Sequence, residues 1–256
     1  MKGRLSPWFL LLIAVTVTGG ALTVPGTAAL ATSDHSFLLS AGLLLLVVGG
    51  WAVSLCLHEW AHAFVALRGG DWSVREKGYL TLDIRRYTDI GLSIVLPVIF
   101  LLLGGIALPG GAVWINHGLL RSRAARSLVS LAGPVTNLVL GIALLAVTAL
   151  VPVPLGLAAG LSTLAFFQML AFLLNILPVP GLDGWGVLEP YVAPRGINPL
   201  VRSWAPLVFF VLLITFPPLL SALSSGAAWI YQLAGGDLRL FGAGYSEMRF
   251  WDWARW

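Results

Sequence analysis

The stretch LLSAGLLLLVVGGWAVSLCLHEWAHAFVAL, residues 38–67, decides what class of protein this is. It is apolar over more than the ~20 residues that an α-helix needs to cross the hydrocarbon core of a bilayer. Histidine and glutamate interrupt it only at His58, Glu59 and His62, about one helical turn in all. Ionisable side chains cost about 2.5–3.5 kcal/mol each within a membrane on insertion scales, so their presence indicates a function.

The spacing of these three residues predicts a zinc site. Residues four apart share one face of a helix, so the imidazoles of His58 and His62 can reach the same ion. Neutral imidazole suits zinc, and zinc lowers the pKa of bound water to about 7. Glu59 can take the proton from that water, so we predict it as the general base. The alternative is a buried structural cluster of histidine and glutamate.

A third protein ligand is expected, because two histidines leave a tetrahedral zinc short of one. The segment NILPVPGLDG, residues 175–184, holds the best candidate, Asp183. Pro178 and Pro180 disfavour a continuous helix, so the span should unwind there and let Asp183 turn back toward the metal. The alternative is an ordinary turn at the membrane interface, with the aspartate capping it locally.

A further polar residue lies in the segment AGPVTN, residues 132–137. Asn137 could donate its amide to a developing oxyanion or to substrate backbone. It could equally make a hydrogen bond between helices, as asparagines in membranes often do. His35 and His117 have no partner at ligand spacing and are expected in loops.

The whole composition agrees with a membrane protein. The 256 residues are 58% hydrophobic and 10% charged, whereas soluble domains carry about 25% charged residues. The net charge of +4 is scattered over short loops. That distribution suits a lipid bilayer as partner and argues against nucleic acid, which would need a basic stripe.

We expect an all-α polytopic membrane protein with about six transmembrane helices and a small re-entrant β-hairpin. The hairpin is predicted at residues 104–117, around a Pro109-Gly110-Gly111 turn, and a short strand is predicted at residues 80–84. The first run could instead be a cleaved signal peptide, although an uncleaved span is favoured. The apolar runs of spanning length are residues 8–27, 38–67, 90–108, 127–151, 155–177 and 204–222.

Basic residues orient the predicted spans. Lys2 and Arg4 place the N-terminus in the cytosol by the positive-inside rule. If the second span enters the hydrocarbon near Leu38, His58 lies roughly 30 Å further along it. We therefore expect a multi-pass protein of the cell membrane with its active site near the cytosolic side.

Taken together, HEWAH at 58–62, GPVTN at 133–137 and NILPVPGLDG at 175–184 resemble the site-2 protease family (peptidase M50) in its compact form without PDZ or CBS domain. The resemblance implies a zinc metalloendopeptidase with metal ligands His58, His62 and Asp183 and catalytic Glu59. Asn175, which opens the third motif, becomes a candidate substrate-binding residue beside Asn137. The implied substrate is a membrane protein cut in or near a transmembrane helix, for example a single-span regulator such as an anti-sigma factor.

We expect one membrane-embedded protease domain over residues 1–256, with a core at 38–190, an accessory first span at 8–27 and a C-terminal span and tail at 204–256. Two other classes of function stay open: a membrane metal transporter and an inactive protease-like scaffold. A different HExxH membrane protease would take its third ligand from a glutamate. Glu189 is the nearest candidate, but Pro190 argues against a helix there.

Overall fold

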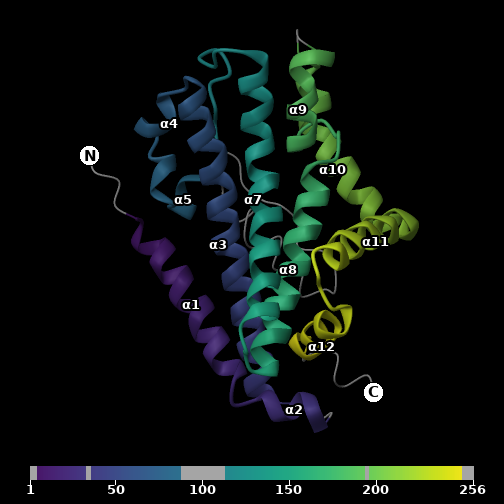
Figure 1. The fold of residues 1–256 in the computed structure, drawn as a ribbon. Helices are drawn as coiled ribbons and strands as arrows, with labels where there is room; N and C mark the ends of the chain where they lie inside the picture. The colour runs from purple at the N-terminus through teal and green to yellow at the C-terminus, as the bar shows by residue number, and fades with distance from the viewer. Residues whose placement is uncertain (1–4, 33–35, 88–112, 194–195, 250–256) are drawn as a thin grey trace.

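A computed structural model of the chain describes residues 5–32, 36–87, 113–193 and 196–249. Within these ranges every regular element is a helix, and the long helices run side by side (Figure 1). The elements are α1 (Pro7–Thr23), α2 (Thr27–Thr32), α3 (Phe37–Gly69), α4 (Ser73–Glu76), the 3-10 helix η1 (Tyr79–Thr81), α5 (Ile84–Tyr87), α7 (Arg123–Leu150), α8 (Leu155–Asn175), α9 (Asp183–Val192), α10 (Pro199–Thr215), α11 (Pro217–Leu233) and α12 (Leu238–Met248).

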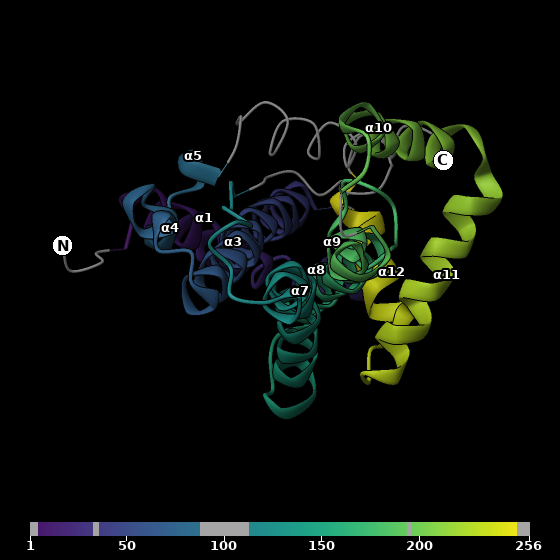
Figure 2. The ribbon, with the colours of Figure 1, turned by 90° about the horizontal axis from the view of Figure 1, so that it is seen from above.

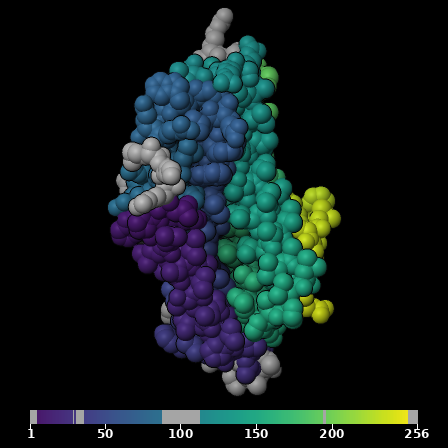
Figure 3. Space-filling view, turned by 60° about the vertical axis from the view of Figure 1, so that its left-hand side comes forward, coloured from purple at the N-terminus to yellow at the C-terminus, as the bar shows by residue number. Residues whose placement is uncertain are grey.

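Helix α3 is the longest helix of the described structure and contains the histidine motif. Its 33 residues make a helix about 50 Å long. Helix α1 runs antiparallel beside it and approaches closely, since a β-carbon on Gly19 would clash with the backbone of Leu46. Small residues allow such contacts between membrane helices. Figure 3 shows α1, in purple, against the blue segment that includes α4 and α5, where Ser6 N–H donates to the Thr81 carbonyl at 2.9 Å.

Helices α7 and α8 form the other half of the core. The Ser122 hydroxyl caps α7 by accepting a hydrogen bond from Ala125 N–H at 3.0 Å. Helix α8 is buried on most of its faces, as its nearly uniform apolar sequence requires. Seen from above in Figure 2, α3, α7 and α8 form the centre, and α11 lies at the periphery beyond α12.

Three hydrogen bonds fix the two ends of the bundle. At one end, Ser127 Oγ on α7 donates to the Val187 carbonyl on α9 at 2.7 Å. At the other end, Glu247 on α12 accepts hydrogen bonds from Ser36 N–H at 3.1 Å and Ser40 Oγ at 3.0 Å. Helices α4 and α9 lie at the first of these ends, at the top of Figure 1.

The expectation of about six transmembrane helices is wrong for the part of the chain that the structure describes. Three helices there are long and apolar enough to cross a membrane: α3, α7 and α8. Helices α10 and α11 count as a fourth span only as a pair bent by 95°. Pro217 and Pro218 open α11, and proline cannot continue a preceding helix, so the predicted run 204–222 breaks there. Helix α1 has only 17 residues, and the predicted run 90–108 lies outside the described residues.

The prediction of strands is also wrong, because no strand occurs in the described ranges. Residues 113–117 of the proposed hairpin are irregular, and 104–112 lie outside the described residues. At 80–84 the chain forms η1 and then turns at Leu82, whose φ is 57°. The Asp83 carboxylate accepts from Arg85 N–H at 3.2 Å, and such a local hydrogen bond favours a turn over a strand.

Candidate metal centre

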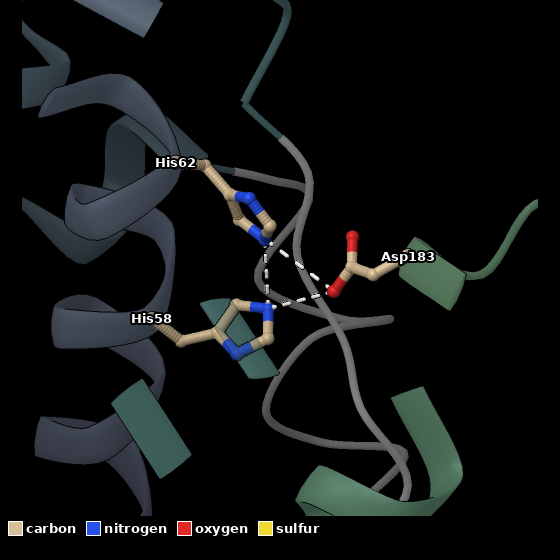
Figure 4. Close-up of side chains that lie close together, drawn as sticks. All are labelled: His58, His62 and Asp183. Atoms are coloured by element: carbon tan, nitrogen blue, oxygen red, sulfur yellow. Dashed lines mark hydrogen bonds and ion pairs between the residues drawn. The ribbon is translucent and has the colours of Figure 1, made fainter. Parts of the chain in front are cut away.

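Three candidate ligand atoms, from two helices far apart in the sequence, meet at one point (Figure 4). Nε2 of His58 and Nε2 of His62 on α3 lie 3.0 Å apart. Oδ2 of Asp183, the first residue of α9, lies 3.2 Å from the former and 3.4 Å from the latter. Ligands bound to a tetrahedral zinc at about 2.0–2.1 Å are about 3.3–3.4 Å apart. The triangle therefore has the size that a zinc ion requires.

The hydrogen bonds behind the imidazoles aim their lone pairs at the same point. His62 Nδ1 lies 2.6 Å from the Val129 carbonyl oxygen, which only accepts, so Nδ1 donates and Nε2 carries the lone pair. His58 Nδ1 lies 2.5 Å from Asn137 Oδ1, which orients that ring in the same way. With the Asp183 carboxylate, three acceptors then face one another. A cation between them removes the repulsion, and ligating histidines commonly have such outer partners.

Gly133 on α7 provides the room for a metal ion. A β-carbon built on Gly133 would lie 2.2 Å from His62 Nε2 and 2.4 Å from His58 Nε2. These lengths are close to a zinc–nitrogen bond of about 2.0–2.1 Å. The missing side chain therefore leaves space where one ion reaches both imidazoles, and the residues present fit a zinc ion.

The prolines and glycines between α8 and α9 bring Asp183 back to α3. Helix α8 ends at Asn175, and the chain turns through Gly181, whose φ is 93° and is easily adopted only by glycine. A β-carbon on Gly184 would collide with the Ile176 carbonyl, so the chain doubles back tightly. Asp183 then begins α9, where the helix N-terminus favours a carboxylate.

Glu59 lies beside the three candidate ligands and is held by the segment that begins at Val113. Its side chain is buried, and its Oε2 accepts a hydrogen bond from Val113 N–H at 3.0 Å. The buried Asp71 fixes the same segment by accepting from Asn116 N–H at 2.7 Å. Glu59 and the three ligand residues line one cavity of about 310 Å³.

Both asparagines line the cavity. Asn137 turns its oxygen to His58 and donates from Nδ2 to Gln168 Oε1 at 2.8 Å, so it bridges α3, α7 and α8. This arrangement agrees with the interhelical alternative. Asn175 lines the cavity beside the ligands.

Of the two remaining histidines, the structure describes only His117. His117 also lines the cavity, which its sequence position did not indicate, whereas His35 lies outside the described residues. Burial lowers the pKa of His117, and Arg126 and Arg202 lower it further, so the ring stays neutral near pH 7.

Sequence reasoning missed Gln168, the Val129 carbonyl and the role of Gly133. Gln168 had a usable signal, since it and Asn175 are the two side-chain amides within the apolar run 155–177. A backbone carbonyl and a missing β-carbon leave no such mark, because their roles depend only on which helices come together.

Comparisons with known proteins give one consistent result. A protein of Mycobacterium tuberculosis named "Putative zinc metalloprotease Rip2" is 45% identical over 252 residues, which covers 97% of this chain and 95% of the relative. A protein of the same name from Mycolicibacterium smegmatis is 44% identical over 254 residues, with the same coverage of 97% and 95%. "Putative zinc metalloprotease YwhC" of Bacillus subtilis is 34% identical over 206 residues, covering 75% of this chain and 88% of the relative. No family model and no solved structure matches the chain.

Proposed function

The chain belongs to the site-2 protease family of zinc metalloproteases, and from this premise we propose that it hydrolyses a peptide bond in or beside a membrane-spanning helix of another protein. One observation carries the proposal. Candidate ligand atoms of His58, His62 and Asp183 lie within 3.4 Å of one another. They line a cavity, one wall of which is the apolar spanning helix α3. The metal is zinc.

We assign the zinc ligands to His58, His62 and Asp183. Nδ1 of each imidazole donates away from the site, which leaves each Nε2 as a neutral donor of an electron pair. Asp183 adds one negative charge. Because the protein supplies three ligands, the fourth position of a tetrahedral zinc is left for water or substrate, as in catalytic zinc sites. Bound zinc supplies Lewis-acid chemistry, making water a nucleophile near neutral pH and polarising a carbonyl.

Glu59 is the residue assigned to move the proton. It follows His58 directly on α3 and lines the same cavity. It accepts a proton from the attacking water and passes it to the leaving amine. The Val113 amide holds Oε2 at 3.0 Å and thereby fixes the direction of the carboxylate.

The walls of the cavity suit an apolar polypeptide. A peptide bond of a spanning helix could enter between such walls without leaving charged groups unpaired. We assign Asn175, which lies among them, to hydrogen bonding with unwound substrate backbone. The apolar residues that line the cavity are Trp51, Leu55, Val113, Ile115, Val129, Ala171, Leu182, Pro206 and Phe210.

The charge distribution supports a site near the cytosolic side of the cell membrane. Basic side chains gather at the end of the bundle where α3 finishes and α7 begins, and the positive-inside rule assigns that end to the cytosol. The opposite end, near Ser36 and Glu247, carries fewer basic residues, and Arg249 is one of them. The basic residues at the first end are Arg68, Arg75, Lys77, Arg85, Arg86, Arg121, Arg123 and Arg126.

A metal transporter is less well supported than a protease. A transporter needs several ligand sets along a pathway. In the described ranges, His58, His62 and Asp183 form the only group of three such ligands. A single-span regulator such as an anti-sigma factor remains the substrate class that the family resemblance suggests, acted on by one protease domain with its core at 38–190.

The proposal is tested with purified protein in liposomes and a single-span substrate tagged at both ends. We expect two fragments on a gel, no cleavage after treatment with a zinc chelator, and recovery when zinc is added back. Cleavage that persists in the metal-free protein would contradict the proposal.

A further inference from the structure

Gln168 is a buried amide that the proposed reaction does not use. It lies in the middle of α8 with no exposed surface. Its Oε1 accepts a hydrogen bond from Asn137 Nδ2 at 2.8 Å. Its Nε2 is buried without a partner among the described residues. A buried donor without a partner is destabilising, so the burial of this amide is not explained by packing alone.

The neighbour of Gln168 controls the tautomer of a zinc ligand. Asn137 presents Oδ1 to His58 Nδ1 at 2.5 Å. In this orientation the proton is on Nδ1, and Nε2 offers its lone pair to the metal. If the amide turned over, Nδ2 would donate to Nδ1 instead. The proton of His58 would then be on Nε2, facing His62 and Asp183, and that nitrogen could not bind zinc.

The two imidazoles differ in how strongly their surroundings fix the tautomer. His62 faces the Val129 carbonyl, which accepts and cannot donate, so its tautomer is fixed by the backbone. His58 faces a side-chain amide that can present either end. A second group is therefore needed to hold that amide in the orientation that allows metal binding.

We propose that Gln168 is this group: a positioning residue whose amide oxygen holds Asn137 so that His58 presents an unprotonated Nε2 to zinc. Without an acceptor at residue 168, the competent orientation leaves Asn137 N–H groups buried and unpaired. With Gln168 Oε1 in its observed place, turning Asn137 over would instead set two amide oxygens against each other, so the competent orientation is the one that makes a hydrogen bond. The inference rests on the proposed ligand set.

The experiment measures zinc affinity by competition with a chelator, using the full chain in detergent. Gln168→Met replaces the amide by an apolar chain of similar length, and we expect zinc to bind about 10–100-fold more weakly. Thr163→Val is the matched control, since it removes a buried side-chain hydrogen bond from the same helix, away from the metal. It should bind zinc as the parent does. Gln168→Leu serves as the second variant if the methionine protein does not fold.

Repeating the measurement in an Asn137→Asp protein distinguishes a positioning role of Gln168 from a packing role. Asn137→Asp places a carboxylate opposite His58, and a carboxylate only accepts, so it needs no partner to orient it. In that background, adding Gln168→Met should leave zinc affinity within about twofold of Asn137→Asp alone. An equal loss in both backgrounds would show that Gln168 acts only through packing and would overturn the proposal.

His58→Ala distinguishes this inference from the ligand assignment. If His58→Ala abolishes zinc binding while Gln168→Met binds like the parent, only the role of Gln168 is wrong. If His58→Ala retains zinc at parent affinity, the ligand set itself is wrong, and the role of Gln168 fails with it. Thermal unfolding of the metal-free proteins shows that each variant is folded.

Discussion

Gly133 lies so close to His62 that a β-carbon on it would stand 2.2 Å from the ring nitrogen Nε2. The backbone of α7 therefore forms one wall of the metal centre, although it supplies no ligand. This contact depends on a residue with no side chain, and it makes the site sensitive to the addition of one methyl group.

Gly133→Ala is expected to lower zinc affinity by at least about 100-fold, because its methyl group would occupy the space that the metal needs. Gly242→Ala on α12 is the control, since a β-carbon there would meet nothing within 4 Å. Metal content by mass spectrometry and unfolding temperature check both proteins. A Gly133→Ala protein that keeps zinc would place the metal elsewhere.

Glu59→Gln should reduce cleavage by about 10²–10⁴-fold while zinc and fold are retained. Glutamine fills nearly the same volume and can still accept the hydrogen bond from Val113 N–H, so only the basicity is lost. The rate of cleavage in liposomes is measured beside the zinc content of the same samples. A variant as fast as the parent with zinc present would exclude Glu59 as the base.

Asp183→Asn should weaken zinc binding by about 10-fold or more, because it replaces the one anionic ligand by a neutral amide. Glu189→Gln on the same helix tests the rival ligand. Glu189 pairs with Arg202, so its loss should leave zinc affinity unchanged. Chelator competition on the two proteins decides between them, and the opposite ranking would reassign the third ligand.

A substrate helix with glycine near the cut should be cleaved faster than a leucine-rich one. The scissile carbonyl is hydrogen-bonded within a helix and must be freed before attack. Each glycine lowers helix stability by about 1 kcal/mol, which corresponds to about fivefold in rate if unwinding limits cleavage. Two otherwise identical tagged substrates provide the comparison. Equal rates would mean that unwinding does not limit cleavage.

Asp83 should stabilise the protein in a pH-dependent way. Hydrogen bonds from the Arg85 guanidinium, at 3.0 and 2.8 Å, are the main cause that lowers the pKa of its carboxyl below the usual 3.8. A lowered pKa means that the stabilisation is complete above pH 3.8 and is lost as the pH falls through the folded-state value. The difference in unfolding temperature between the parent and Asp83→Asn should therefore shrink below about pH 4. A difference that stays constant down to pH 2 would contradict this assignment.

The sequence by itself determined what depends on local backbone geometry. Apolar length identified a membrane protein, because a helix rises about 1.5 Å per residue and a bilayer core is about 30 Å thick. The spacing of His58 and His62 placed both rings on one face, since 3.6 residues make a turn. The prolines before Asp183 indicated where the chain must leave its helix.

The tertiary structure alone decided what depends on how helices pack. The orientation of both imidazoles is set by Val129 and Asn137, far away along the chain, and the space for the metal by Gly133. Residues 80–84 alternate like a strand, yet the Asp83 side chain bonds locally and turns the chain, while Leu82 and Ile84 are both buried. Apolar periodicity reports which residues avoid water. It does not report which partner they pack against, because many helix neighbours satisfy the same apolar face equally well.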